Sequence, residues 1–482
     1  MSLPNSRHFR VAIVGGGIAG LTLALILERT GVSFVLWEGH ESIAPEIGAG
    51  IGLLPNGLRI LDQLGLLGEI ESRTVPLQIW HHINSDGMAI SDVEAHKHYR
   101  HAFGYGSRFL RRSELLQILY GAIQNKDPVM TSTRLSNIEE SEQHSKIVSI
   151  DGRWVTADIV VGADGVHSPV RRCVELFVGR DMSETRMAAV ADKQTPAPDL
   201  ANIRSAREAQ FACVFGISSP VRGLEAGECF AVYRREATIL VLTGKGGIVF
   251  WFVFEHRDEA DALTEQPTDD TADIENAGRS VAHLQLTTSV TFGDIFANRT
   301  SARKTVLDEG LATHWSASRM VIIGDAAHTM VPHLAMGANQ AIESAAALSN
   351  ELLRIHQWEL GGITGAIERY TQVRRGRAAA ATNMAGMICR AQLCCTGYDH
   401  ISSSIPRLKF ADWMVRALVG FRGAAMVESL PRTKRGQYFD EKMGRFFERL
   451  EHRHGQVEGG KMPGLSNEEF LDIFDWAVDW KN

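Results

Sequence analysis

The segment that decides the fold is Phe9-Arg-Val-Ala-Ile-Val-Gly15-Gly-Gly17-Ile-Ala-Gly20, near the start of the 482-residue chain. A short β-branched apolar run ends at the glycines, and residues 18–30 then show the periodicity of a buried helix that stops at Gly31. Residues 32–37 form a second apolar run and predict another strand. The segment therefore predicts a βαβ unit with parallel strands and a right-handed crossover.

The glycines have the Gly-x-Gly-x-x-Gly spacing of a loop that binds a dinucleotide. Gly15 permits the tight turn, Gly17 lets the backbone approach the diphosphate, and Gly20 lets the helix pack on the strand. The unpaired N–H groups and the positive end of the helix dipole stabilise the phosphate charge. Glu38 ends the second strand, where a carboxylate accepts hydrogen bonds from ribose hydroxyls. The motif predicts a dinucleotide site and by itself does not separate FAD from NAD.

Two later segments repeat the pattern of an apolar strand followed by a loop. Residues 158–162 lead into Asp164 and Gly165, and residues 320–324 lead into Asp325. Open α/β sheets bind ligands at the carboxyl ends of their strands, so both loops are expected at the dinucleotide site. Between them, residues 175–300 contain strand-like stretches that predict an antiparallel sheet, to which residues 70–110 could add strands. These stretches are Cys229–Tyr233, Thr238–Leu242 and Gly247–Phe254.

Composition and charge exclude several classes of protein. A net charge of −7 with dispersed arginines provides no basic field for nucleic acid. The six cysteines lack metal-ligand spacing and are expected to be reduced thiols of an intracellular protein. The N-terminus has no apolar signal-peptide region, and the longest apolar stretch, residues 411–427, contains three charged residues. We expect a cytoplasmic or peripherally membrane-associated protein.

Three motifs in this order resemble those of the class A FAD-dependent monooxygenases, which have the para-hydroxybenzoate hydroxylase fold. The glycine loop with Glu38 is the first. The second, residues 158–171 around Asp164 and Gly165, is similar to the family's Asp-Gly motif, which contacts FAD and NAD(P)H. The third, residues 324–332, is similar to the Gly-Asp motif, whose aspartate, here Asp325, reaches the ribityl chain of FAD. The resemblance also implies that two further residues, Arg112 at a helix start and Gly52 in a turn, lie beside FAD.

The resemblance narrows to fungal FAD-dependent epoxidases of indole-diterpene and meroterpenoid pathways, the paxilline-type monooxygenase family. It spans most of residues 9–380. One departure is the segment Leu334-Ala-Met-Gly337-Ala338-Asn339, which stands where relatives usually have a Gly-Gln-Gly-type loop. The backbone N–H groups of Gly337, Ala338 and Asn339 are nevertheless expected to face the flavin, because the next helix begins there.

The resemblance implies a reaction as well as a cofactor. NAD(P)H reduces FAD, oxygen adds at flavin C4a, and the hydroperoxide transfers one oxygen atom to a small lipophilic substrate. We expect epoxidation of a prenyl alkene in a meroterpenoid or terpenoid intermediate of secondary metabolism, which needs no side-chain nucleophile. Three alternatives stay open: hydroxylation of an aromatic polyketide, reduction of a polyprenyl substrate, and a non-catalytic flavin-binding protein.

If the substrate is a phenol, a side chain has to stabilise the phenolate. Tyr233 is the candidate catalytic residue, with Arg204 and Arg207 as alternatives. A tyrosine in a strand, such as Tyr233, is more often a core aromatic with a satisfied hydroxyl. Histidines 314, 328 and 333 predict no metal site, because two of them belong to the flavin loop. The pair Arg374 and Arg375 is interpreted as a solvated or interdomain face.

The expected fold class is α/β, with a Rossmann-like FAD-binding domain interleaved with an antiparallel-sheet substrate domain and followed by a helical C-terminal region. The FAD-binding domain is discontinuous and comprises residues 1–70, 105–175 and 300–355. The substrate domain comprises residues 71–104 and 176–299, and the helical region residues 356–482. No sequence feature determines the oligomeric state, and a lipophilic substrate would favour peripheral association with a membrane.

Overall fold

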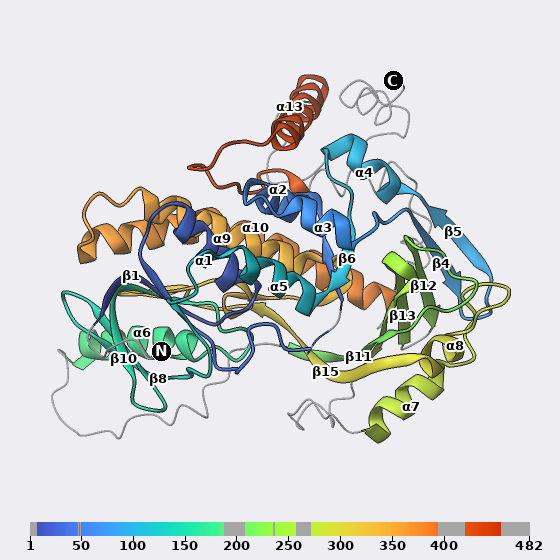
Figure 1. Cartoon of the computed structure of the whole chain (residues 1–482), viewed down its shortest axis with the longest axis horizontal. Helices are drawn as coiled ribbons and strands as arrows, with labels where there is room; N and C mark the ends of the chain where they lie inside the picture. Colours follow the sequence, from blue (N-terminus) through green and yellow to red (C-terminus); the bar gives the residue numbers. More distant parts are fainter. Residues whose placement is uncertain are drawn as a thin grey trace.

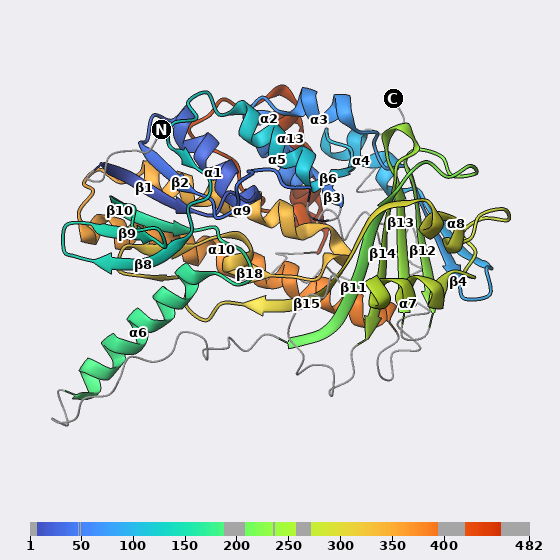
Figure 2. The ribbon, with the colours of Figure 1, turned by 60° about the horizontal axis from the view of Figure 1, so that its bottom comes forward.

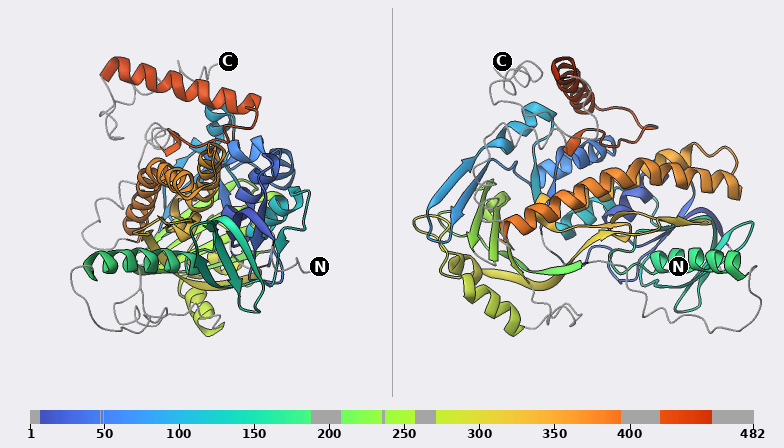
Figure 3. Two further views of the ribbon diagram at one scale, coloured as in Figure 1. Left: turned by 90° about the vertical axis from the view of Figure 1, so that its left-hand side faces the viewer. Right: turned by 180° about the vertical axis from the view of Figure 1, so that it is seen from behind.

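The computed structural model describes residues 7–46, 48, 50–187, 208–234, 237–256, 271–393 and 420–454. Within them two eight-stranded sheets lie at opposite ends of an elongated molecule (Figure 1). The helix α10 (Leu360–Gln392) runs between the two ends, as the view from behind in Figure 3 also shows. Arg204 and Arg207 lie outside the described residues.

The first sheet contains the predicted βαβ unit. Strand β1 (His8–Val14) leads into α1 (Ile18–Arg29), and β2 (Phe34–Trp37) pairs in parallel with β1. On its other side β1 pairs in parallel with β10 (Trp154–Gly162), which pairs in parallel with β17 (Met320–Ile322). The sheet is completed by β7 (Val129–Met130), β8 (Leu135–Glu140), β9 (Ser145–Ser149) and β16 (Ser316–Ala317). The parallel core is buried on both faces, which explains the continuous apolar runs in its strands.

The second sheet is largely antiparallel and has two different faces. Its order is β18-β15-β11-β14-β13-β12-β4-β5. Successive side chains of β14 (Val249–His256) alternate between the faces, as in any strand. One face packs under α7 (Thr271–Val281) and α8 (Phe292–Ala297), with Trp251 in that core. The other face carries Phe250, Phe252 and Phe254 and joins a cluster with residues of α10.

The remaining strands of this sheet come from four parts of the chain. They are β4 (Ile79–Asn84), β5 (Ala89–Val93), β11 (Glu208–Ser218), β12 (Glu228–Arg234), β13 (Ala237–Thr243), β15 (Arg299–Leu311) and β18 (His328–Thr329). Strand β15 pairs with β11, so residues 300–311 belong to this sheet although the expected domain boundary places them with the FAD-binding domain. The stretch between residues 70 and 110 adds β4 and β5 to the same sheet.

Helices cover the first sheet and connect it to the second. Around α1 lie α5 (Arg112–Ala122) and α9 (Met336–Leu353), while α6 (Pro169–Met187) projects away from the body (Figure 2). The others are α2 (Pro55–Gln63), α3 (Leu67–Arg73), α4 (Ala95–Phe103) and α13 (Lys434–His454). A small two-stranded sheet pairs β3 (Gly50–Leu53) with β6 (Arg108–Arg111). This arrangement confirms the α/β class. Among the described helices, we find no candidate for a membrane-spanning segment.

A buried charge network holds α2, α9 and α10 together. The Glu343 carboxylate, fully buried, accepts hydrogen bonds from Arg374 Nη1 at 2.9 Å, Arg377 Nε at 2.6 Å and Asn56 Nδ2 at 2.7 Å. Although burial raises the pKa of Glu343, the two guanidinium groups lower it to about 2. Of the two interpretations of Arg374, as part of a solvated or an interdomain face, the solvated one is wrong, because its side chain is only 1% exposed. The neighbouring Arg375 donates to Thr313 O at the surface.

Candidate functional site

The predicted loops meet at one edge of the first sheet. Val14 is in register with Trp37 on one side and with Gly162 on the other, and Gly162 is in register with Ile322. Parallel strands that end in one row place the segments after them side by side. The glycine loop, Glu38 and the loops bearing Asp164 and Asp325 therefore share this edge.

The glycine loop has the shape that a diphosphate requires. Gly15 has φ +107°, and a Cβ there would lie 2.4 Å from the carbonyl oxygen of Ala163. A Cβ at Gly20 would lie 2.0 Å from the oxygen of Gly15, so α1 packs directly on the turn. At Gly17, in contrast, a Cβ would meet only Ala163 O at 4.0 Å. Protein packing does not explain this glycine, whereas the approach of a phosphate to the free N–H groups of α1 does.

Glu38 lies directly beside that loop. Its carboxylate accepts hydrogen bonds from the backbone N–H of Gly16 at 2.7 Å and from the N–H of His40 at 2.8 Å, and its side chain is 14% exposed. The His40 ring is 2.6 Å from the same carboxylate. Glu38 is therefore held at the end of β2 with its carboxylate against the glycine turn, the position from which a ribose would be bound.

Arg112 connects this end of the site to the other. Burial lowers the pKa of its guanidinium, and the negative charges of Asp325 and Glu38 partly offset that effect. Both carboxylates therefore interact electrostatically with the Arg112 guanidinium at the start of α5. Glu38 follows β2 and Asp325 follows β17, which are not neighbouring strands of the sheet. Asp325 lies in the short turn Gly324–Ala326 and is exposed at the sheet edge. Arg112 thus lies near enough to Glu38 and Asp325 to feel the charge of both carboxylates, as one extended cofactor site would require.

Asp164 has a different set of contacts from that of the other two acids. Its carboxylate accepts hydrogen bonds from the Ser168 hydroxyl and from the N–H of Val170 at 3.0 Å, and so caps the start of α6. Burial raises the pKa of Asp164 against the lowering effect of these hydrogen bonds. Arg171, one turn further on, donates to Ala326 O at 3.0 Å and ties this loop to that of Asp325. Gly165 has φ +80° and no atom within 4 Å of a Cβ position, so its backbone is open to a ligand.

The far end of the site is formed by β3 and the start of α9. Gly52 faces Ala335, since a Cβ at Gly52 would lie 2.6 Å from Ala335 Cβ. The Asn339 side chain, fully buried, donates to Gly52 O at 2.9 Å and to Ala335 O at 2.6 Å and accepts from the N–H of Leu54 at 3.0 Å. The side chain of Asn339 is thus used to join the two segments. Gly337 and Ala338, followed by Asn339, lie in the first turn of α9, and the N–H groups of Gly337 and Ala338 have no partner within the helix.

Tyr233 lies on the same face of the second sheet as the phenylalanines of β14. Its hydroxyl is 2.7 Å from His82 Nδ1, and the two rings are stacked with an interplanar angle of 3°. Burial raises the pKa of Tyr233, and burial lowers that of His82 to about 4. The pair is therefore neutral at physiological pH. Such a pair can hold a hydrogen bond but does not favour Tyr233 as a base.

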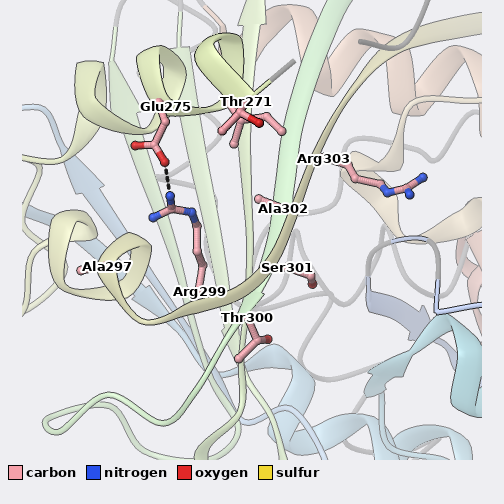
Figure 4. Close-up of a pocket in the computed structure, with 9 residues that line it drawn as sticks. Thr271, Glu275, Ala297, Arg299, Thr300, Ser301, Ala302 and Arg303 are labelled. Atoms are coloured by element: carbon pink, nitrogen blue, oxygen red, sulfur yellow. Dashed lines mark hydrogen bonds and ion pairs between the residues drawn. The ribbon is translucent and has the colours of Figure 1, made fainter. Parts of the chain in front are cut away.

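Three residues at the site were not predicted from the sequence. Arg171 lies at the end of the second motif, His82 lies in β4, and His333 lies in the loop after Asp325. Each becomes recognisable through contacts with residues far away in the chain. A separate surface pocket lies between α7 and β15. Arg299 lines it, and its guanidinium forms an ion pair with Glu275 (Figure 4).

The geometry fits FAD as the dinucleotide. The space that Gly17 leaves open would accept a diphosphate, Glu38 would bind a ribose, and Arg112 and Asp325 would continue the site towards the start of α9. Over residues 8–385 the chain matches the family described as "FAD binding domain". The class defined by the fold and the site is that of the FAD-binding flavoproteins.

Similar proteins specify the class further. The FAD-dependent monooxygenase atmM of Aspergillus flavus is 37% identical over 345 residues, which cover 72% of this chain and 69% of that protein. The FAD-dependent monooxygenase ptmM of Penicillium ochrochloron is 37% identical over 380 residues, which cover 77% and 86% of the two chains. The chain belongs to the family of FAD-dependent monooxygenases and, as predicted, is an oxidoreductase with FAD as its cofactor.

Solved structures share the fold at low sequence identity. The HpxO protein of Klebsiella pneumoniae, in complex with FAD and uric acid, aligns with a TM-score of 0.67 at 17% identity, covering 86% of this chain and 97% of HpxO. The 2,6-dihydroxypyridine-3-hydroxylase of Arthrobacter nicotinovorans aligns with a TM-score of 0.63 at 20% identity, covering 88% and 97% of the chains. These likenesses confirm the architecture, with its FAD-binding sheet and its second, largely antiparallel sheet.

Proposed function

We propose that the protein uses NAD(P)H and O2 to epoxidise a prenyl alkene on a meroterpenoid or terpenoid intermediate of fungal secondary metabolism. The observation that carries the proposal is the row Phe250, Phe252 and Phe254 on the face of the second sheet that is joined by Val331, a residue of the loop after Asp325. When bound and reduced by NAD(P)H, FAD supplies the activated oxygen atom. An aromatic and aliphatic wall suits an apolar chain better than a charged substrate.

The residues of the chain have three tasks in this reaction. Glu38, Arg112 and Asp325, with the glycine loop, hold the cofactor and fix its position relative to the second sheet. The phenylalanine row, extended by Phe109 of β6, binds the prenyl chain and excludes water from the reacting atoms. No side chain has to act as nucleophile or base, because an alkene attacks an electrophilic oxygen without losing a proton. The neutral state of Tyr233 and His82 agrees with this requirement.

The test is the transfer of labelled oxygen by the purified holoenzyme. A farnesylated phenol is incubated with NADPH or NADH under 18O2, and the product is located by mass spectrometry. The same phenol with a saturated chain is the matched control. The proposal requires one labelled oxygen on the alkene chain and no product from the saturated control. A label on the aromatic ring would instead establish a hydroxylase, and saturation of the alkene without oxygen would establish a reductase.

A further inference from the structure

His333 lies where the first sheet's loops meet the aromatic face of the second sheet. It belongs to the turn Pro332–Leu334, directly before the start of α9. Its ring centroid is 4.1 Å from that of Phe254. Phe254 in turn stacks on Phe252 at 6.1 Å, and Phe109 contacts Phe252 at 6.3 Å, edge to face. His333 is therefore a heterocycle at the end of a row of phenyl rings.

The ring nitrogens of His333 are buried without any hydrogen-bond partner among the described residues. Buried polar atoms nearly always have partners, since leaving one without a partner destabilises the protein. Burial also lowers the pKa of His333 to about 3, so the ring is neutral at physiological pH. A neutral imidazole has one N–H donor and one nitrogen acceptor, and at His333 neither has a partner among the described residues.

In two other histidines of the described chain, one ring nitrogen is held by a neighbour. His82 Nδ1 is 2.7 Å from the Tyr233 hydroxyl, and His96 Nδ1 is 2.9 Å from the Ser107 hydroxyl. Each of these rings is thus held by a neighbour within the fold. Since His333 has no such neighbour among the described residues, its ring nitrogens could bond to a ligand that reaches the ring.

We propose that His333 forms a hydrogen bond with a hydroxyl group on the otherwise apolar substrate and so positions the alkene over the flavin. This inference rests on the proposed function and adds to it a substrate class, a prenylated molecule that carries a hydroxyl group close to the start of α9. A hydroxyl both donates and accepts, so it satisfies either tautomer of the neutral ring. The row of phenyl rings binds the apolar part of the substrate. The hydrogen bond between His333 and the hydroxyl group determines the orientation of the substrate relative to the flavin.

The first test needs no substrate. Phenylalanine retains the aromatic ring and has no polar atoms, so His333→Phe removes two unsatisfied nitrogens and should raise the melting temperature of the holoenzyme by about 2 °C. His82→Phe is the matched control: it removes a buried histidine whose Nδ1 has a partner, takes one hydrogen bond away from the Tyr233 hydroxyl, and should lower the melting temperature. A fall in melting temperature for His333→Phe would show a structural role and overturn the proposal.

The second test uses two probes, a farnesylated phenol and the corresponding farnesylbenzene, titrated into the holoenzyme and followed by the flavin absorption spectrum. The wild type should bind the phenol about tenfold more tightly than the hydrocarbon. His333→Phe should bind both equally, and His333→Gln, which retains a donor and an acceptor, should recover part of the preference. Equal binding of the two probes by the wild type, binding of neither, or an unchanged preference in His333→Phe would refute the assignment.

Failure of the proposed reaction gives a different result from failure of this inference. Without oxygen transfer, neither probe would gain an oxygen atom with any variant, yet the rise in melting temperature and the loss of the hydroxyl preference would persist. If only the inference is wrong, labelled product forms with the wild type and with His333→Phe at the same KM.

Discussion

Replacing Gly52 by alanine tests how closely β3 approaches the start of α9 at the flavin end of the site. The new Cβ would lie 2.6 Å from Ala335 Cβ, whereas its next neighbour, Phe109 Cδ2, is at an ordinary 3.5 Å. Methyl carbons in contact are about 3.5–4.0 Å apart, so the two segments would have to separate by roughly 1 Å. Asn339 opposes that separation, because it donates to the carbonyl oxygens of both Gly52 and Ala335. Overpacking of this kind costs about 1–3 kcal/mol.

The same contact predicts that Ala335→Gly rescues Gly52→Ala. Ala335 has φ +51°, a left-handed conformation that costs an alanine about 1 kcal/mol and a glycine nothing. The extra freedom of glycine in the unfolded chain costs about 0.5–1 kcal/mol, so Ala335→Gly alone should be nearly neutral. In the double variant the clash is absent, and the coupling between the two sites should recover most of the 1–3 kcal/mol.

The assay is thermal unfolding of the holoenzyme, followed by circular dichroism and by flavin fluorescence. We expect Gly52→Ala to melt several degrees lower and to release FAD earlier, and the double variant to melt close to the wild type. Gly50→Ala is the matched control, because its Cβ would lie 2.0 Å from Phe109 and 2.6 Å from Phe250, which Ala335→Gly does not relieve. The reasoning is refuted if Gly52→Ala is as stable as the wild type, or if Ala335→Gly rescues both glycine variants equally.

Three further predictions concern the cofactor, the buried charges and the second sheet. Glu38→Ala and Asp325→Ala should each weaken FAD binding about tenfold or more, measured by fluorescence titration of apoprotein; full flavin occupancy in both would contradict their roles. Glu343→Gln should destabilise the fold by about 3 kcal/mol or more in urea unfolding, since the buried Arg374 loses its counter-charge, and unchanged stability would exclude this account. Because the pKa of Glu343 is lowered in the folded state to about 2, its contribution to stability is present above its ordinary value near 4.5 and is lost as the pH falls from there towards 2; the variant should lack this part of the acid sensitivity. Tyr233→Phe should retain oxygen transfer within a few-fold while lowering the melting temperature, and a loss of turnover by a hundredfold would instead establish Tyr233 as catalytic.

The cofactor end of the site was predictable because it is built from residues that are close together in the chain. The turn at Gly15, the free N–H groups of α1 and the acid at the end of β2 follow from residues within one βαβ unit. The same is true of Asp325, which directly follows a short apolar strand. Motif order then identified the family, and the α/β class followed from the strand pattern.

The reaction end depends on contacts that no local pattern contains. The sequence shows that Gly52, Ala335 and Asn339 exist, but only the packing of β3 on α9 shows that they touch. Likewise, Arg374 looks like a surface arginine until α10 places it against Glu343 in α9. Such contacts are determined by the register of segments that lie far apart in the chain, and side-chain periodicity does not encode that register.

What the sequence by itself determined is the dinucleotide loop and the class of the fold, because hydrogen bonding at strand ends and helix starts involves neighbours in the chain. The choice of FAD came from the resemblance of three ordered motifs to a known family. What only the tertiary structure decided is the aromatic face of the second sheet, where we propose that the substrate binds. Two features depend on how two sheets from interleaved parts of the chain pack together: which face of β14 carries its phenylalanines towards α10, and that His333 ends their row with no partner for its ring nitrogens among the described residues.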